Sequence, residues 1–197
     1  MTPKNVPDTG AIPRPRVCLP AVFIDRDGTL MEEVRYCNDP EKVQLIEGAR
    51  EGIKLLRSNG YRIVIVTNQA GIARGLITPS QYAAVHRRLL ELLGSERPDA
   101  TYMCPDGPDE PSTHRKPAPG MLYQARDEQH LDLTRSWMIG DKGIDVQCGL
   151  NAGTRSILVL TGYGREVNPS GACHIAENFF AASRWIASQP PATLQTG

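Results

Sequence analysis

The sequence lacks the features that mark membrane-spanning, secreted and disulfide-stabilised proteins. No apolar run among its 197 residues is long enough to span a bilayer, and the first sixteen residues have no hydrophobic core of a secretory signal. The five cysteines are widely spaced and include no Cys-x-x-Cys pair. An odd number of cysteines without a disulfide framework predicts reduced thiols and a cytoplasmic location.

An excess of charge of either sign is also absent. The 22 basic residues balance the 22 acidic residues, so the formal net charge is zero. This balance argues against nucleic-acid or membrane partners, which attract strongly basic proteins. Aromatic residues make up only 6% of the chain, and the hydrophobic content of 40% is ordinary for a globular protein. The composition sets no oligomeric state, and a monomer is our expectation.

The length of the chain suits one domain with a sizeable core. Residues 1–16 carry prolines and scattered charges, which predicts a flexible leader. Residues 188–197, which include Pro190 and Pro191, are expected to form a flexible tail. The predicted domain therefore comprises residues 17–187.

Apolar periodicity predicts alternating strands and helices within this domain. Strands are expected over residues 19–24, 61–66, 100–104, 136–139 and 156–160, and helices over residues 48–59, 79–94, 119–130, 144–151 and 176–188. The second helix has a clear start signal, because Thr78 and Gln81 form a capping box around Pro79. This alternation predicts an α/β fold in which a mainly parallel sheet lies between two layers of helices, a three-layer Rossmann-like arrangement.

Polar residues follow the predicted strands at the places where ligands bind in such sheets. Asp25 and Asp27 come directly after the first strand, the pair Thr67-Asn68 follows the second, and Asp141 follows the fourth. Carboxylates buried at a strand end are costly unless a cation or a reaction uses them. The pattern therefore indicates a catalytic or metal-binding site at the carboxyl edge of the sheet.

Four segments in chain order carry a resemblance to a known superfamily. They are Asp25-x-Asp27-Gly28-Thr29, Thr67-Asn68, Lys116-Pro117, and Gly140-Asp141-Lys142 with Asp145. Together they resemble the four motifs of the haloacid dehalogenase (HAD) superfamily of phosphotransferases, over roughly residues 17–165. Each segment alone has an ordinary explanation, such as a turn around Gly28 or a helix cap at Asp141. Those separate explanations do not account for the shared order, so we favour the catalytic interpretation.

A phosphate monoester hydrolase needs a nucleophile, a proton donor and positive charge to offset a dianionic substrate. Asp25 is the predicted nucleophile, which would form an aspartyl-phosphate. Asp27 is the predicted acid for the leaving oxygen and the base for the attacking water. Because an anion attacks a dianion, Mg²⁺ is expected, with Asp25, Asp141 and the backbone carbonyl of Asp27 as ligands.

The remaining motif residues are predicted to hold the phosphoryl group. The Thr67 hydroxyl and the Asn68 amide would contact its non-bridging oxygens, and Lys116 would supply fixed positive charge. Lys142 and Asp145 are expected to support this arrangement from the fourth motif.

Longer matches point to one branch of the superfamily. Residues 23–30, 66–75, 115–122 and 138–142 resemble the D-glycero-D-manno-heptose 1,7-bisphosphate phosphatases, and the histidinol-phosphate phosphatases share much of this pattern. The resemblance implies a compact, essentially capless phosphatase. It also implies that Arg74 and Arg115 contact the substrate or its second phosphate, since guanidinium groups bind phosphate bidentately. Solvent-exposed arginines without such a role are an equal alternative.

The chain departs from this branch at one loop. Members often carry a structural zinc loop, Cys-x-His followed by Cys-x-Cys just before Arg-Lys-Pro. The matching residues here are Cys104-Pro105-Asp106 and Ser112-Thr113-His114. Structural zinc takes four nitrogen or sulfur ligands in a tetrahedron, and Cys104, Asp106 and His114 form an incomplete set. No structural zinc is therefore predicted.

The sequence thus predicts a Mg²⁺-dependent HAD phosphatase whose partner is a small phosphorylated metabolite. The first candidate substrate is a sugar bisphosphate such as D-glycero-D-manno-heptose 1,7-bisphosphate. Histidinol phosphate is the enzymatic alternative. A catalytically weak phosphate-binding module is the non-enzymatic alternative, and it predicts binding without turnover.

Overall fold

The computed structural model describes residues 18–190. The expected leader, residues 1–16, lies outside the described residues, as does the expected tail from residue 191 onward. Ser188, where the tail was expected to begin, is the last residue of the final helix. No helix of the described part is both long and apolar enough to cross a membrane.

Strands and helices alternate along the described chain. The strands are β1 (Ala21–Ile24), β2 (Arg62–Asn68), β3 (Ala100–Cys104), β4 (Trp137–Gly140), β5 (Arg155–Val159) and β6 (His174–Ala176). The helices are α1 (Ala49–Ser58), α2 (Pro79–Leu93), α3 (Gly120–Gln129), α4 (Gly143–Ala152) and α5 (Phe179–Ser188). Short 3-10 turns lie between some of these elements.

The strands form one parallel sheet in the order β3-β2-β1-β4-β5-β6. The chain builds outward from β1 to β3 on one side and from β4 to β6 on the other. The strand order therefore reverses between β1 and β4, and α/β sheets bind ligands beyond the carboxyl ends of the strands at such a point. The predicted α/β fold with a parallel sheet is confirmed.

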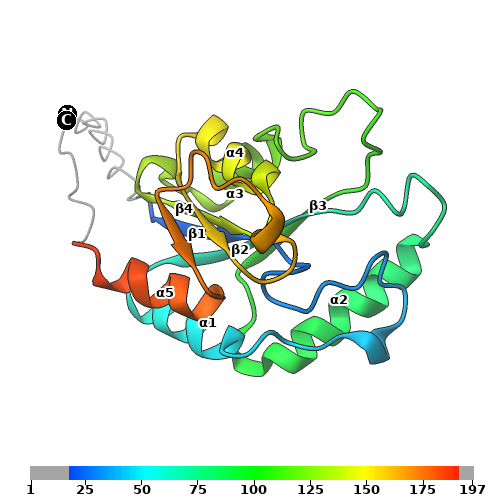
Figure 1. Cartoon of the computed structure of the whole chain (residues 1–197), viewed down its shortest axis with the longest axis horizontal. Coiled ribbons are helices and arrows are strands. Elements are labelled where there is room, and N and C mark those ends of the chain that lie inside the picture. The colour runs from blue at the N-terminus through cyan, green and yellow to red at the C-terminus, as the bar shows by residue number, and fades with distance from the viewer. Residues whose placement is uncertain (1–17, 191–197) are drawn as a thin grey trace, which may run out of the picture.

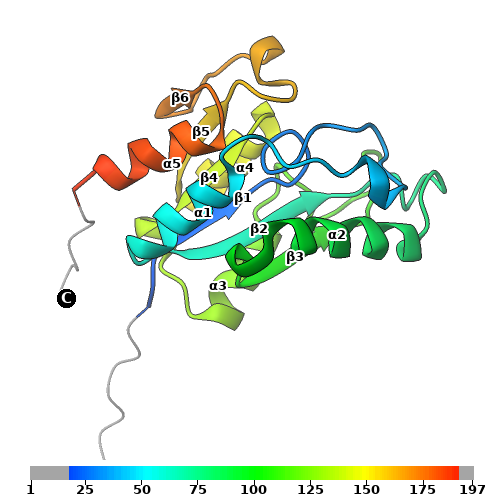
Figure 2. The same cartoon turned by 90° about the horizontal axis from the view of Figure 1, so that it is seen from below.

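Helices cover both faces of the sheet, as the predicted three layers require (Figure 1). Helices α1, α2 and α5 pack on one face, which Figure 2 shows from below. Helices α3 and α4 pack on the other face. Successive residues of β1 divide between the two cores, since Val22 and Ile24 face α1 and α5 while Phe23 lies among the residues of α3 and α4. A strand buried on both faces has to be apolar throughout, and β1 is.

Local signals explain where several helices begin. The Thr78 hydroxyl accepts a hydrogen bond from the Gln81 backbone N–H at 3.2 Å, and the Gln81 side chain accepts one from the Thr78 N–H at 2.8 Å. The predicted capping box is therefore confirmed. The side chain of Asn178 caps α5 by accepting from the Ala181 N–H at 2.9 Å.

The predicted start of the last helix is wrong. A helix was expected over residues 176–188, but Ala176 ends β6 and α5 begins at Phe179. A strand of three residues at the edge of a sheet is too short to show alternation in the sequence.

Among the described residues no separate folded unit covers the carboxyl edge of the sheet. The segment between β1 and α1 forms much of the surroundings of this edge (Figure 1).

Candidate active site

The candidate site lies at the carboxyl edge of β1, β2 and β4. Asp25 directly follows β1, and its backbone N–H donates to the Ile139 carbonyl of β4 at 2.9 Å. Thr67 and Asn68 end β2, and Asp141 directly follows β4. Because the three strands are neighbours, their terminal residues meet at the switch point of the sheet. The fold thus brings together three of the four motifs, as expected from their positions after the predicted parallel strands.

Lys116 links the third motif to the other three. Its side chain is 1% exposed, and its ammonium nitrogen Nζ lies 2.5 Å from Asp25 Oδ1 and 2.7 Å from Asp145 Oδ1. The same nitrogen donates to the Val66 carbonyl at 2.9 Å. Burial opposes a charge on Lys116, but the carboxylates of Asp145 and Asp25 outweigh it and raise the pKa of the ammonium above its ordinary value. Lys116 is therefore a fixed cation beside the predicted nucleophile.

Asp141 is fully buried in a cradle of glycines. Gly28 and Gly162 both have positive φ angles, 83° and 51°. A side chain at either position would collide with the carboxylate of Asp141. One oxygen of that carboxylate, Oδ2, accepts from the Tyr163 N–H at 2.9 Å. The other, Oδ1, is buried and has no hydrogen-bond partner among the described residues.

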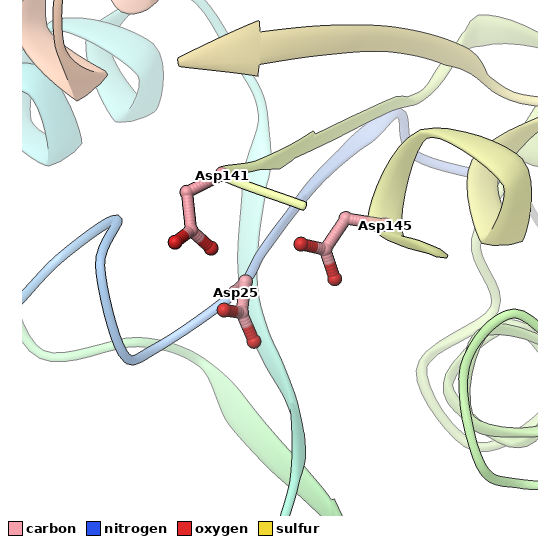
Figure 3. A group of neighbouring side chains, drawn as sticks. All are labelled: Asp25, Asp141 and Asp145. Carbon is pink, nitrogen blue, oxygen red and sulfur yellow. The ribbon is translucent and has the colours of Figure 1, made fainter. Parts of the chain in front are cut away.

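Three carboxyl groups converge at the site, as Figure 3 shows, and two of them pair with Lys116. Asp25, Asp141 and Asp145 each offer an oxygen, and these oxygens all lie within 4.8 Å of one another. Asp145 Oδ1 forms an ion pair with Lys116 Nζ at 2.7 Å, and Asp145 Oδ2 accepts a hydrogen bond from the Lys142 N–H at 3.0 Å. The free oxygen of Asp141 and the oxygen of Asp25 that does not face Lys116 remain for a cation. The donor set is all carboxylate oxygen, which suits a hard divalent ion.

Burial raises the pKa values of two carboxyl groups in the cluster. Burial raises the pKa of Asp25 to about 7, against the lowering effect of Lys116 and with help from Asp145 and Asp141. Burial likewise raises the pKa of Asp141 to about 6, although Lys142 and the Tyr163 N–H oppose the rise. It is costly for both buried carboxyl groups to be ionised side by side. A divalent cation bound between them would offset this cost, so it should bind there favourably.

Asp27 is held away from this cluster by neighbours that were not predicted to matter. The Arg26 guanidinium binds its carboxylate bidentately, with Nε 3.0 Å from Oδ2 and Nη2 3.1 Å from Oδ1. Gln69 donates to Asp27 Oδ2 at 3.0 Å and to the Thr67 hydroxyl at 2.9 Å. Arg26 is itself buried and lies over the ring of Tyr82 in α2. These contacts fix the orientation of Asp27 at the wall of the cavity.

The Asn68 amide contacts the backbone of the Lys116 loop. Its side-chain nitrogen donates to the Lys116 carbonyl at 3.1 Å, and its side-chain oxygen accepts from the Lys116 N–H at 3.0 Å. The amide therefore orients the residue that supplies the fixed charge. A direct contact of Asn68 or Thr67 with phosphate stays a prediction.

A cavity of about 320 Å³ opens above the carboxylates. Its deep residues include the motif side chains Asp25, Asp27, Thr67, Lys116 and Asp145. Asp141 is fully buried and is not among the residues that line the cavity. The cavity therefore gives a substrate direct access to Asp25 but not to Asp141.

Three arginines, Arg35, Arg74 and Arg115, line the same cavity. Tyr36 joins two of them, because its hydroxyl accepts from Arg74 Nη1 at 2.5 Å and its ring lies 5.6 Å below the Arg35 guanidinium. Tyr36 also has a positive φ of 53°, an uncommon backbone conformation for a bulky residue. The structure thus places Arg74 and Arg115 at the cavity, where the resemblance implied them, and adds Arg35.

Lys142 ties the fourth motif to the segment between β1 and α1. Its ammonium donates to Glu33 Oε2 at 2.9 Å and lies 4.7 Å from the centre of the Tyr163 ring. It is also 3.9 Å from the free oxygen of Asp141. Lys142 is therefore a second cation near the carboxylate cluster, and Glu33 holds it there.

Several residues of the site were missed by the sequence analysis: Arg26, Glu33, Arg35, Tyr36 and Gln69. Arg26 and Gln69 adjoin motif residues, so their positions were a usable signal. Glu33, Arg35 and Tyr36 belong to a segment without periodicity, and only the folded chain shows that it borders the cavity.

Comparison with known proteins identifies relatives across nearly the whole chain. The HAD-hydrolase-like family model matches residues 113–179. The D-glycero-D-manno-heptose-1,7-bisphosphate 7-phosphatase of Chlorobaculum tepidum is 40% identical over 192 residues, covering 86% of this chain and 95% of that protein. The D-glycero-beta-D-manno-heptose-1,7-bisphosphate 7-phosphatase of Escherichia coli K12 is 35% identical over 179 residues, covering 85% of this chain and 88% of that protein.

Solved structures agree with this relationship. The D,D-heptose 1,7-bisphosphate phosphatase of B. bronchiseptica, solved with magnesium and phosphate, superposes with a TM-score of 0.78 and 29% identity. The match covers 85% of this chain and 98% of that one. A putative HAD-like phosphatase of Mesorhizobium loti is 40% identical with a TM-score of 0.67, over 72% of this chain and 73% of that one. The chain therefore belongs to the D-glycero-D-manno-heptose-1,7-bisphosphate 7-phosphatase family of HAD-like hydrolases.

Proposed function

We propose that this protein is a Mg²⁺-dependent phosphatase that removes the C7 phosphate of a D-glycero-D-manno-heptose 1,7-bisphosphate through an aspartyl-phosphate on Asp25. The observation that carries the proposal is the position of Asp25, which lines the cavity with Lys116 on one oxygen and Asp141 within reach of the other. A carboxylate placed in this way can attack phosphorus only if its charge and that of the substrate are offset.

Each residue has a distinct proposed task. Asp25 attacks the phosphorus atom, while Lys116 and the Thr67 hydroxyl stabilise the phosphoryl oxygens. Asp27, oriented by Arg26 and Gln69, gives a proton to the leaving sugar oxygen. In the second half of the reaction Asp27 accepts a proton from the water that attacks the aspartyl-phosphate.

The proposed Mg²⁺ site uses Asp25, Asp141 and the backbone carbonyl of Asp27. When bound, the ion supplies positive charge that offsets the repulsion between the nucleophile and the phosphate dianion. The buried and unpartnered oxygen of Asp141 supports this site, because such an atom is costly without a ligand. Asp145 fits a supporting role better than a ligand role, since both its oxygens are engaged.

The arginines of the cavity support a bisphosphate over the enzymatic alternative. Arg35, Arg74 and Arg115 together suit a second anionic group. Histidinol phosphate instead carries a cationic amine, which three neighbouring guanidinium groups would repel. A phosphate-binding module without turnover would leave the position of Asp25 in the lining of the cavity unexplained.

A kinetic panel tests the proposed substrate. Heptose 1,7-bisphosphate, hexose bisphosphates, sugar monophosphates, histidinol phosphate and an aryl phosphate are compared with and without Mg²⁺. We expect the heptose bisphosphate to have the highest kcat/KM and no substrate to turn over without a divalent ion. A preference for histidinol phosphate would reject the substrate, and folded, metal-loaded protein without any turnover would favour the binding module.

Replacing Asp27 by Asn tests its role as the acid. We expect turnover to fall most for sugar phosphates, whose alkoxide leaving groups need a proton, by about 10²–10⁴-fold. Aryl phosphates with good leaving groups should lose much less in the first step, which is measured as the burst of released phenol. An equal loss of the burst rate for both substrate types would count against this role.

Metal binding is expected to depend on pH. Because the folded pKa values of Asp25 and Asp141 are raised to about 7 and about 6, these groups take up protons on folding and their protonation stabilises the metal-free protein at low pH. That contribution is complete below the ordinary carboxyl pKa of 3.8 and is lost as pH rises from there to about 7, where Mg²⁺ replaces it by binding the ionised groups. Mg²⁺ should therefore raise Tm more at pH 8 than at pH 5.

Thermal unfolding at both pH values, with NaCl of equal ionic strength as the control, measures this difference. The Asp141→Asn variant should lose most of the Mg²⁺-dependent increase at pH 8. An equal Mg²⁺ effect at both pH values would contradict the assignment of the ion to these carboxylates.

We also propose a cytoplasmic location and a monomeric state. None of the five cysteines forms a disulfide bond within residues 18–190, which supports the predicted reducing, cytoplasmic location. Cell fractionation tests the location, and light scattering tests the expected monomer.

A further inference from the structure

The loop between β3 and α3 forms one wall of the cavity. Pro108 and Arg115 of this loop line the cavity, and Arg115 adjoins the catalytic cation Lys116. The loop therefore has to hold a fixed shape if Arg115 is to meet a substrate group. Its hydrogen bonds show how this shape is maintained.

Ser112 forms a tight turn in the middle of the loop. Its hydroxyl oxygen accepts from the His114 N–H at 3.2 Å and from the Arg115 N–H at 3.0 Å. The same oxygen lies 3.6 Å from the sulfur of Cys104, the last residue of β3. With two backbone donors on its oxygen, the Ser112 hydroxyl has its own hydrogen left to donate to the sulfur.

Cys104 extends this connection to the start of the loop. The side chain is buried, and its thiol donates to Asp106 Oδ2 at 3.4 Å. Burial raises the pKa of the Cys104 thiol, so it keeps the proton that this hydrogen bond needs. The carbonyl of Asp106 in turn accepts from Arg115 Nη1 at 3.1 Å. Ser112, Cys104 and Asp106 thus form a closed chain of contacts, called here the thiol clasp, that ends on the Arg115 guanidinium.

The structural zinc that members of the resembling branch often carry does not fit these residues. Ser112 offers a hydroxyl where that pattern has a thiolate, and the Cys104 sulfur is engaged by two neighbours. The His114 ring nitrogen Nδ1 lies 3.2 Å from the Thr113 hydroxyl. Within residues 18–190, the group of three acidic, histidine or cysteine ligand atoms within 4.8 Å lies at the catalytic carboxylates and not at this loop.

We propose that the thiol clasp closes this loop without a metal and positions Arg115 for the second anionic group of the substrate. The role of Arg115 rests on the proposed function, whereas closure of the loop does not. Cys104 and Ser112 are positioning residues, because they act through Arg115 and do not face the reacting phosphate.

The Ser112→Ala variant tests the clasp, with Ser95→Ala as a matched control. Ser95 bonds the neighbouring Glu96 beyond the end of α2, at the opposite edge of the sheet. Closure is measured by the rate at which an alkylating reagent labels Cys104, followed by peptide mass spectrometry, with exposed Cys173 as the internal standard. We expect faster labelling of Cys104 in Ser112→Ala, no change in Ser95→Ala, and no zinc in purified wild-type protein.

Positioning is measured by a ratio of kinetic constants in the same variants. The kcat/KM for heptose bisphosphate, divided by that for an aryl phosphate with one phosphate group, should fall about fivefold in Ser112→Ala, as expected for the loss of one hydrogen bond. The fall should appear mainly in KM. Cys104→Ala should lower the ratio in the same direction.

The outcomes separate the clasp from the proposed function. Unchanged Cys104 labelling in Ser112→Ala, or one tightly held zinc per chain whose removal exposes Cys104, would overturn the clasp. Faster labelling with an unchanged kinetic ratio would overturn the positioning of Arg115. If no phosphate ester turns over, the proposed function fails, and the labelling and zinc analysis still decide closure of the loop.

Discussion

Replacing Asp25 by Asn is expected to lower kcat by about four orders of magnitude or more, for sugar and aryl phosphates alike. The amide cannot form the aspartyl-phosphate, so both substrates lose the same nucleophile. Steady-state release of phosphate measures the loss. The equal effect on both leaving groups distinguishes this variant from Asp27→Asn, whose effect depends on the leaving group.

The fold of Asp25→Asn should survive. Lys116 keeps Asp145 and the Val66 carbonyl as partners, and the amide has the shape of the carboxyl group. Because burial raises the pKa of Asp25 to about 7, its neutral form is already populated in the metal-free protein near neutral pH. The free energy of unfolding should therefore change by no more than about 1 kcal/mol.

A matched control separates the nucleophile from a general effect of lost charge. Asp127→Asn removes a carboxylate that pairs with Arg126 on the surface of α3. It should leave kcat unchanged. If folded Asp25→Asn retained near-normal turnover, the assigned nucleophile would be wrong. Unfolding of this variant would instead contradict the stability expected above.

Replacing Lys116 by Met is expected to abolish turnover and to destabilise the protein by about 3–5 kcal/mol. The ammonium is the shared partner of two buried carboxylates, Asp25 and Asp145, at 2.5 and 2.7 Å. Its removal leaves Asp25 and Asp145 buried without their shared cation at pH 8, where both are ionised, and this costs far more than the loss of a surface ion pair. Denaturant unfolding in the presence of a metal chelator measures the change.

The pH dependence of this variant gives a second test. Lys116 lowers the pKa of Asp25, so its removal lets the carboxyl group bind a proton more readily. Protonation removes one of the unpaired buried charges, and the destabilisation should therefore be smaller at pH 5 than at pH 8. Lys54→Met, on the exposed side of α1, is the control and should be nearly neutral at both pH values. A destabilisation of the same size at both pH values would contradict the account of the buried cluster.

Much of the fold follows from short-range patterns in the sequence. The β3 strand was expected over residues 100–104 and lies there, and the capping box at Thr78 begins α2 as predicted. These signals depend on neighbouring residues, so one sequence is enough to detect them. The β6 strand, at His174–Ala176, is defined by its pairing with β5 and not by its own three residues. It was therefore invisible to periodicity.

The same distinction between local patterns and distant contacts applies to the residues of the site. Asp25, Asp141 and Lys116 could be proposed from motif order and strand ends, because parallel strands bring their carboxyl ends to one edge. The buried pairing of Arg26 with Asp27 depends on Tyr82 in α2, and nothing in the sequence relates those positions. The cavity position of Tyr36 similarly depends on how the segment after β1 returns across the sheet edge. The sequence alone therefore did not predict the contacts between segments that are distant along the chain.

The most direct test of the central claim is a crystal structure with Mg²⁺ and beryllium fluoride, which mimics a phosphoryl group on a carboxylate. We predict that beryllium is bonded to the side chain of Asp25, with the metal ion between Asp25 and Asp141. The ammonium of Lys116 should contact the fluoride atoms or the Asp25 oxygen that is not bonded to beryllium. Beryllium on any other residue, or an ion that does not contact Asp141, would contradict the account.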